Sequence, residues 1–122
     1  MAERSDTVIV TGSTGFIGSA LINRFAGGFS LVGLDRATTH QPPPAAECVF
    51  IDLTSAKAVA AGLPRVRTAY GQRIASVIHL AAYFDLTGKP NPLYEEITVG
   101  GTEKLLRALQ SFEVEQFIFA SS

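Results

Sequence analysis

The chain has 122 residues, one cysteine and a formal net charge of −1, which allows one domain at most and excludes proteins that bind nucleic acid or anionic membranes through clustered positive charge. A lone cysteine can form neither an internal disulfide nor a zinc site, the polar start MAERSD lacks the apolar core of a signal peptide, and no run of roughly 18 apolar residues follows. We therefore expect a soluble, cytoplasmic protein with neither nucleic acid nor a membrane among its partners.

Five short apolar runs predict buried strands. They read TVIVT at 7–11, FSLVGL at 29–34, CVFI at 48–51, SVIHL at 76–80 and QFIFA at 116–120. Continuous apolar runs are typical of a parallel sheet that helices cover on both faces. The charged fraction of 17%, below the ~25% of an average soluble domain, indicates either such burial or a surface that meets more protein.

Segments with the apolar spacing of a helix lie between several of these runs. Each of two segments predicts one buried stripe: residues 16–25 through Phe16, Ile17, Ala20, Leu21 and Phe25, and residues 93–109 through Ile97, Leu105, Leu106 and Leu109. The alternation of strand and helix predicts an α/β fold with a Rossmann-type doubly wound parallel sheet, about five strands in the order 3-2-1-4-5.

Two segments show no regular pattern. Three consecutive prolines in residues 38–47 can neither donate to a sheet nor continue a helix, so we expect a surface loop there. The polar residues 63–73 carry Arg65, Arg67 and Arg73. We interpret these arginines as a solvated face in preference to an anion site, because hydrated charges need no ligand.

A glycine-rich turn, TGSTGFIG at residues 11–18, follows the first strand and opens the first helix. At such a turn the first N–H groups of the helix and the positive end of its dipole suit a pyrophosphate. The absence of Cβ at Gly12 and Gly15 permits a tight turn and a close ligand, and Gly18 permits close packing of helix and strand. The alternative is a tight turn that binds nothing.

Asp35 supports the nucleotide interpretation. It ends the second strand 20 residues after Gly15, where a dinucleotide-binding fold places an acid that accepts hydrogen bonds from the ribose hydroxyls. Because a carboxylate repels a 2′-phosphate, Asp35 favours NAD, whereas the neighbouring Arg36 offers a phosphate partner and leaves NADP open. The alternative for Asp35 is a turn residue after a strand.

The spacing G-x-x-G-x-x-G resembles that of the extended short-chain dehydrogenase/reductases, the NAD-dependent epimerase/dehydratase family. Four further motifs follow in the order of that family. They are Asp52-Leu53, then HLAA at 79–82, then TVGGT at 98–102, which is similar to N-V-x-G-T, and FIFASS at 117–122. The resemblance spans the whole chain.

The resemblance implies roles for individual residues. The cofactor-binding set would comprise the glycine turn with Thr14, Phe16 and Ile17, the ribose pair Asp35 and Arg36, Asp52 and Leu53 beside the adenine, and Leu80, Ala81, Ala82 and Tyr83 beside a ribose. Ser122 would be the catalytic hydroxyl that hydrogen-bonds the substrate oxygen. Tyr83 and Asp85 also follow the carboxyl end of a strand, where ligands bind in such sheets.

Two residues of these motifs need separate interpretation. His79 lies within a strand, where an imidazole is more often a satisfied core group than a catalytic one, so we interpret it as structural. Thr98 stands where the family has an asparagine that helps to order a water. This departure puts a proton relay through position 98 in doubt.

The catalytic base of the family, a tyrosine followed four positions later by a lysine, has no counterpart. The positions four residues after Tyr70, Tyr83 and Tyr94 hold Ile74, Thr87 and Thr98. We therefore expect residues 1–122 to be a partial NAD(P)-binding Rossmann domain, truncated before the catalytic helix, without the catalytic and substrate portion and inactive alone.

The whole protein would then be an oxidoreductase acting on a hydroxyl carbon, with a nucleotide sugar or a similar compound as substrate. The family resemblance also implies a homodimer through the 93–109 helix in the full-length protein. Two other hypotheses stay open: a non-enzymatic NAD(P)-binding regulatory module, and an interaction domain without a ligand.

Overall fold

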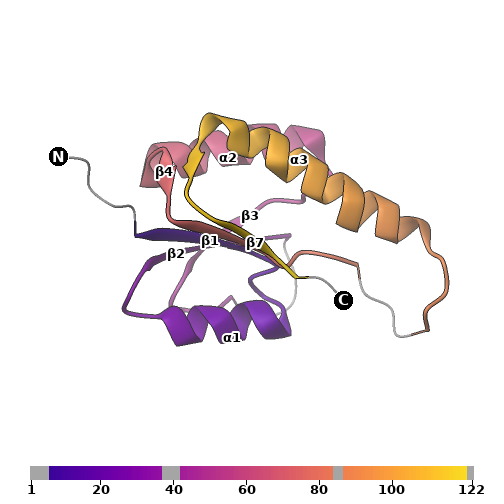
Figure 1. Cartoon of the computed structure of the whole chain (residues 1–122), viewed down its shortest axis with the longest axis horizontal. Coiled ribbons are helices and arrows are strands. Elements are labelled where there is room, and N and C mark those ends of the chain that lie inside the picture. The colour runs from indigo at the N-terminus through magenta and orange to yellow at the C-terminus, as the bar shows by residue number, and fades with distance from the viewer. Residues whose placement is uncertain (1–5, 37–41, 84–86, 121–122) are drawn as a thin grey trace.

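Five parallel strands form the main sheet of the computed structural model, which describes residues 6–36, 42–83 and 87–120. In spatial order they are β3 (Glu47–Phe50), β2 (Ser30–Asp35), β1 (Thr7–Thr11), β5 (Ser76–His79) and β7 (Phe117–Phe119). Helix α1 (Phe16–Phe25) covers one face, and α2 (Ala56–Tyr70) and α3 (Gly100–Ala108) cover the other (Figure 1). Counted along the chain within this sheet, the strand order is 3-2-1-4-5, so the predicted Rossmann-type fold is confirmed.

The strand register brings the ends of the central strands to one edge of the sheet. Thr11 pairs with Leu34 of β2 on one side and with His79 of β5 on the other. Since all strands are parallel, the segments that follow β1, β2 and β5 leave the sheet side by side. This edge is where ligands bind in open α/β sheets.

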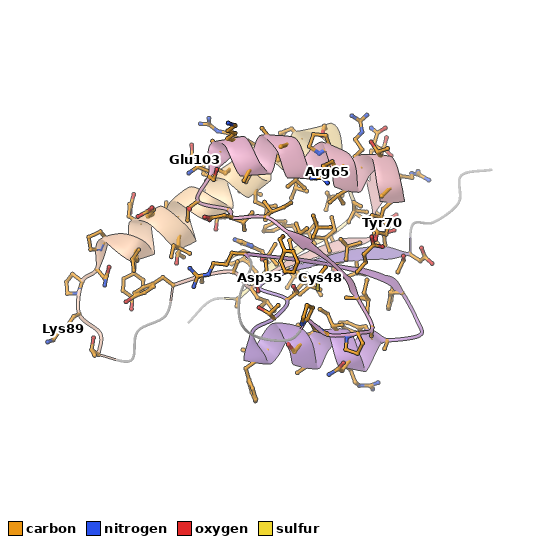
Figure 2. All side chains as sticks on the ribbon, turned by 180° about the vertical axis from the view of Figure 1, so that it is seen from behind. Asp35, Cys48, Arg65, Tyr70, Lys89 and Glu103 are labelled. Atoms are coloured by element: carbon orange, nitrogen blue, oxygen red, sulfur yellow. The ribbon has the colours of Figure 1, made fainter. Side chains whose placement is uncertain are left out.

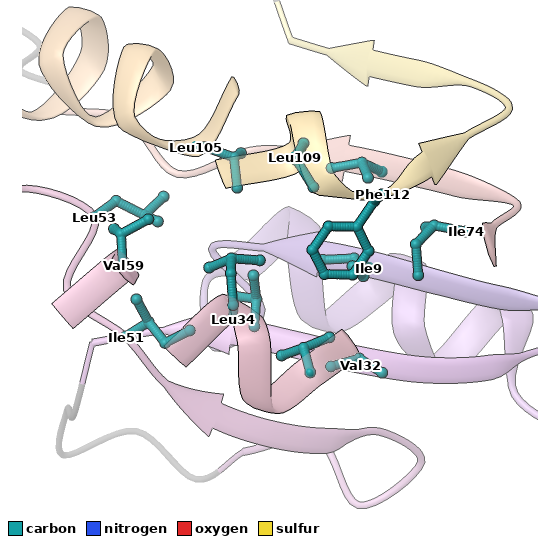
Figure 3. Close-up of a cluster of buried hydrophobic side chains, with 13 residues drawn as sticks. Ile9, Val32, Leu34, Ile51, Leu53, Val59, Ile74, Leu105, Leu109 and Phe112 are labelled. Atoms are coloured by element: carbon teal, nitrogen blue, oxygen red, sulfur yellow. The ribbon is translucent and has the colours of Figure 1, made fainter. Parts of the chain in front are cut away.

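Strand β1 explains why its apolar run is continuous. Ile9 belongs to the larger core between the sheet and helices α2 and α3 (Figure 3). Val8 and Val10 belong to a second cluster on the α1 side. Because successive side chains of a strand point to opposite faces, a strand covered on both faces needs apolar residues at every position.

The two outer strands differ from the prediction of burial on both faces. Phe50 of β3 is 59% exposed, and Phe119 of β7 is 63% exposed. Each of these strands has a neighbour in the sheet on one side only. The continuous apolar run therefore identified the strands correctly, but it did not distinguish central from outer positions.

The predicted stripe of α1 is correct only in its second half, where Leu21 and Phe25 are half-buried and pack against the core. Phe16 and Ile17 are 94% and 59% exposed, and the buried positions are Gly18 and Ile22. A Cβ added to Gly18 would lie 2.2 Å from the carbonyl oxygen of Gly12. The close packing predicted for Gly18 is therefore confirmed, whereas the apolar count wrongly placed Phe16 and Ile17 on the buried face.

Helix α2 corrects the irregular interpretation of residues 63–73, since it runs through Pro64 to Tyr70. Its buried residues Val59, Leu63 and Val66 follow helical spacing, and Arg65 and Arg67 are exposed as expected for a solvated face. Arg73 lies instead in β4 (Arg73–Ile74), where its Nε donates to Glu113 Oε2 at 3.2 Å. That bond joins β4 to β6 (Glu113–Val114) in an unpredicted two-stranded sheet.

The predicted 93–109 helix is present but has three parts. It begins as the π-helix η1 (Tyr94–Val99), continues as α3 and ends in the 3₁₀ turn η2 (Leu109–Ser111). Leu105 and Leu109 are buried as predicted, whereas Leu106 is 42% exposed. No helix within the described ranges is both long enough and apolar enough to cross a membrane.

Candidate functional site

A cleft of about 490 Å³ lies at the carboxyl edge of the sheet, within the size range of small-molecule sites. It brings together most of the predicted cofactor-binding residues: Gly12, Thr14, Gly15, Asp35, Arg36, Asp52, Leu53, Leu80, Ala81, Ala82 and Tyr83. Leu34, Ile51, Thr54 and Ile97 complete its lining. Residues at the ends of four strands, together with Ile97 of η1, therefore converge on one space.

Of the predicted cofactor-binding residues that the structure describes, three do not line this cleft. The side chains of Phe16 and Ile17 are exposed on the first turn of α1, and the backbone N–H groups of these residues are candidates for contact with an anion. Gly18 is buried against the glycine turn. Ser122 and Asp85 lie outside the described residues.

The glycine turn is shaped by two different constraints. Gly12 has φ +68°, and a Cβ built on it would lie 3.1 Å from the backbone nitrogen of Ala81. Gly15 is the N-cap of α1 and gives that helix no side-chain cap. The first-turn N–H groups of α1 therefore have no side-chain partner at the N-cap, as an anion site requires.

Asp35 is hydrogen-bonded to the glycine turn. Its Oδ2 accepts from the backbone N–H of Thr14 at 3.0 Å and from the Thr14 hydroxyl at 2.6 Å. Its Oδ1 accepts from the Arg36 N–H at 2.8 Å. Figure 2 shows Asp35 between the layer of α1 and the layer of α2. The carboxylate thus joins the ends of β1 and β2, in addition to facing the cleft.

Asp52 has a local role in the turn after β3. Its Oδ1 accepts from the Thr54 hydroxyl at 2.7 Å and from the Thr54 N–H at 2.9 Å. These two hydrogen bonds stabilise the ionised carboxylate and lower the pKa of Asp52 below its ordinary value. Ser55 follows as N-cap of α2, its hydroxyl accepting from the Ala58 N–H at 3.1 Å.

The segment after β5 forms the opposite wall of the cleft. The backbone N–H groups of Leu80 and Ala81 each donate to the Thr11 hydroxyl at 3.0 Å. The Tyr83 N–H donates to the Thr98 hydroxyl at 3.0 Å, which ties this wall to η1. Thr98 therefore has a structural partner of its own.

The contacts of His79 confirm that it is a satisfied core group, as predicted. The side chain is buried, with Nδ1 2.7 Å from the Thr11 hydroxyl and Nε2 2.7 Å from the Thr102 hydroxyl. Burial lowers the pKa of this imidazole, because it disfavours the charged form. Both ring nitrogens are satisfied inside the protein.

Sequence reasoning missed several lining residues for different reasons. Leu34 and Ile51 immediately precede Asp35 and Asp52, so their position at the ends of strands could have identified them. Ile97 reaches the cleft from η1, and the sequence shows only its helical spacing. Its contact with the cleft depends on where the helix crosses the sheet.

A glycine turn that opens an uncapped helix and an acid at the end of the second strand, together on a parallel sheet of this order, define a Rossmann-type dinucleotide-binding fold. The chain belongs to the NAD dependent epimerase/dehydratase family, whose sequence profile matches residues 8–122.

Curated relatives cover the chain almost completely. It is 32% identical over 117 residues to a 3 beta-hydroxysteroid dehydrogenase/Delta 5→4-isomerase of Mycobacterium tuberculosis. This alignment covers 94% of the chain and 31% of the relative. It is 28% identical over 121 residues to an N-acetyl-alpha-D-glucosaminyl-diphospho-ditrans,octacis-undecaprenol 4-epimerase of Escherichia coli O157:H7. This second alignment covers 97% of the chain and 33% of that protein. The chain thus spans about a third of the length of these relatives.

Solved structures agree with the fold. A uronate dehydrogenase mutant from Agrobacterium tumefaciens, complexed with NAD, superposes with a TM-score of 0.72 at 25% identity, over 97% of this chain and 41% of the other. MoeE5 in complex with UDP-glucuronic acid and NAD superposes with a TM-score of 0.74 at 29% identity, over 95% and 36%.

Proposed function

We propose that the cleft binds NAD and that the chain is the cofactor-binding part of an oxidoreductase acting on a hydroxyl carbon. The observation that carries the proposal is the glycine turn, where Gly12 leaves room at the cleft wall and Gly15 leaves the first turn of α1 without a side-chain cap. Family membership and the two similar structures that contain NAD support this cofactor.

The residues of the cleft fit the parts of the cofactor. The N–H groups of the α1 first turn, including those of Phe16 and Ile17, would hold the pyrophosphate. Asp35 would accept the ribose hydroxyls and disfavour a 2′-phosphate, with Arg36 beside it. Asp52 and Leu53 would flank the adenine, and residues 80–83 would lie beside the second ribose.

The bound cofactor would supply the two-electron oxidation of the substrate hydroxyl carbon. The chain's own residues hold and orient: the glycine turn fixes the phosphates, Asp35 fixes a ribose, and the wall at 80–83 excludes water from one side. Ser122 would hydrogen-bond the substrate oxygen. No Tyr-x-x-x-Lys pair occurs in the sequence, so we assign the base and the substrate domain to further polypeptide.

The length of the relatives supports this division, since the chain spans about a third of each. We propose a nucleotide sugar or a similar sugar diphosphate as the substrate class, on the likeness to an epimerase of a sugar diphosphate lipid and to MoeE5 with UDP-glucuronic acid. We also propose a cytoplasmic protein without membrane association, which in full length dimerises through the 93–109 helix.

Calorimetric titration of the chain with NAD tests the proposal. We expect binding without the appearance of reduced nicotinamide absorbance when candidate sugars are added. Gly12→Ala should abolish most of the affinity, because its Cβ would lie 3.1 Å from the Ala81 nitrogen at φ +68°. Gly27→Ala is the matched control, since Gly27 has φ +85° but nothing within 4 Å of its added Cβ. Equal NAD affinity in both variants would contradict the proposal, and so would steady turnover by the chain alone.

A non-enzymatic NAD(P)-binding module is the second candidate, favoured by the missing Tyr-x-x-x-Lys pair. It predicts the same binding by this chain. The two candidates differ in what they predict for a longer protein. A gene that continues into a Tyr-x-x-x-Lys helix, with a product that oxidises a sugar hydroxyl, would support the enzyme.

A further inference from the structure

We infer that His79 is a positioning residue, held as the neutral Nε2–H tautomer, which through the Thr11 hydroxyl fixes the distance between the two walls of the cleft. This role rests on the proposed function, because the walls matter only if a cofactor lies between them. A buried histidine with two hydrogen bonds need only support the fold. The positioning role adds the place of each proton in the network and an effect on cofactor binding.

The Thr11 hydroxyl determines one end of the network. Its oxygen accepts from the Leu80 N–H and from the Ala81 N–H, each at 3.0 Å. A hydroxyl has two lone pairs and one proton, so its own proton is left for the imidazole. Thr11 therefore donates to His79 Nδ1 at 2.7 Å, and Nδ1 carries no proton.

The Thr102 hydroxyl determines the other end independently. It donates its proton to the carbonyl oxygen of Thr98 at 2.5 Å. Its oxygen must then accept from His79 Nε2, 2.7 Å away. Both ends assign the same tautomer, with the proton on Nε2, and the ring is neutral. The ring also lies 6.0 Å from that of Phe117 between centroids, and none of these three neighbours titrates.

The network connects the two walls where they are closest. Thr11 directly precedes Gly12, and the Thr11 hydroxyl holds the amides of Leu80 and Ala81. The position of a Gly12 Cβ is only 3.1 Å from the Ala81 nitrogen and 3.2 Å from the Leu80 carbonyl carbon. A shift of the Thr11 hydroxyl would therefore move the glycine turn against the segment that lines the opposite wall.

The Nδ1 acceptor gives the hydroxyl its orientation. If Nδ1 were replaced by an apolar group, the Thr11 hydroxyl proton would lose its acceptor while the oxygen still accepts from the two amides, and a buried donor would be left unsatisfied. Such a loss is costly in a buried network. The interior of the protein would relax by moving the wall, so the effect reaches the cofactor without any contact between His79 and the cofactor.

The tautomer is tested by ¹⁵N-edited NMR of the imidazole in the unmodified chain at neutral pH. We expect a proton on Nε2 and none on Nδ1. A proton on Nδ1, or a charged ring, would overturn the inference whatever the chain binds.

The positioning role is tested by NAD titration of matched variants. His79→Asn retains an acceptor near the place of Nδ1, whereas the similarly shaped His79→Leu removes it. Thr11→Ser retains the hydroxyl, and Thr11→Val removes it. We expect His79→Leu and Thr11→Val to weaken NAD binding about tenfold, as for one lost buried hydrogen bond, and the Asn and Ser variants to retain most of the affinity.

Melting temperatures separate positioning from simple support of the fold. If all four variants bind NAD as the unmodified chain does and differ only in melting temperature, His79 is structural and the inference is wrong. If a variant does not fold, its partner at the same or the other position still decides. If the unmodified chain does not bind NAD, the proposed function fails and the positioning role fails with it, while NMR still decides the tautomer.

Discussion

Two strand-to-helix turns stand at the same edge of the sheet, and they treat the start of their helix in opposite ways. After β1, the N-cap of α1 is Gly15, which provides no side-chain acceptor. After β3, the N-cap of α2 is Ser55, whose hydroxyl accepts from the Ala58 N–H. Neither first turn carries an acidic residue. One helix start is closed by its own sequence, and the other is left for a ligand.

The acids beside the two turns show the same contrast. Asp52 satisfies its own turn through Thr54, two residues away. Asp35 reaches across to Thr14 in the turn of another strand. A turn that folds by itself needs no partner, whereas the glycine turn is held from outside by β2 and by the wall after β5. We therefore expect changes at the first turn to affect ligand binding, with or without an effect on stability, and changes at the second turn to affect stability alone.

The largest effect is expected at Gly18, where α1 meets the glycine turn. In Gly18→Ala the new Cβ would lie 2.2 Å from the Gly12 carbonyl oxygen, and backbone cannot yield as a flexible side chain can. We expect a loss of about 3 kcal/mol in the free energy of unfolding, measured by urea denaturation, together with loss of NAD binding. Gly28→Ala is the control, since its Cβ would meet only Phe25 O at 3.7 Å. Equal stability of the two variants would show that α1 does not depend on this approach.

The next effect comes from closing the open helix start. Gly15→Asp would supply α1 with both a side-chain cap and a negative charge at the place proposed for the pyrophosphate. Gly15→Asn supplies a similar cap and a similar side-chain volume without the charge. We expect the Asp variant to bind NAD about tenfold more weakly than the Asn variant, through repulsion of the phosphates. Titrations at low and high salt check this, because the difference between the variants should shrink with added salt.

The reverse change, opening the closed helix start, should act on stability alone. Ser55→Ala removes the hydroxyl that accepts from the Ala58 N–H at 3.1 Å. We expect a loss of about 1 kcal/mol in the free energy of unfolding, read from urea denaturation, with unchanged NAD affinity. A clear fall in affinity would mean that the two turns are coupled, against the comparison.

The sequence predicted most of the fold because the signals were local. Residues 7–11 were predicted as a strand with the bounds that the structure shows, and the strand order followed from the alternation of strands and helices. Helix α2 was missed because Pro64 and the arginines obscured the spacing of Val59, Leu63 and Val66. Phe16 and Ile17 were wrongly assigned to the buried stripe of α1, because the helix packs closely at Gly18, which the glycine motif predicted but an apolar count cannot show.

The candidate site was predictable at the level of residues but not of bonds. Gly12, Asp35 and Ala81 meet in the cleft as the motifs indicated. That Asp35 holds Thr14, and that Thr11 holds Leu80 and Ala81, depends on the register of β1 with both neighbours. Hydrogen bonds between residues so far apart in the chain require the three-dimensional arrangement.

The smallest expected effect is on stability and comes from the charge of Asp52 in the turn after β3, which Ser55 closes as the N-cap of α2. The Thr54 hydroxyl and then the Thr54 N–H lower the pKa of Asp52 below 3.8 in the folded chain. A carboxylate with a lowered folded pKa stabilises the fold above its unfolded pKa, and this contribution is lost as the pH falls through the folded pKa. The effect should be slight, because the side chain is exposed.

Asp52→Asn keeps an oxygen that can accept from Thr54 but does not titrate. We therefore expect the unmodified chain to lose melting temperature more steeply than this variant as the pH falls below 3.8. Burial lowers the pKa of His79 below 6.5, so His79 destabilises the fold as the pH falls below 6.5. It does so equally in both proteins, which removes it from the comparison. Ser55→Ala should differ from the unmodified chain by the same amount at every pH, because a hydroxyl carries no charge. Parallel acid curves for the unmodified chain and Asp52→Asn would show that the closed turn relies on the geometry of Thr54 and Ser55, not on the charge of Asp52.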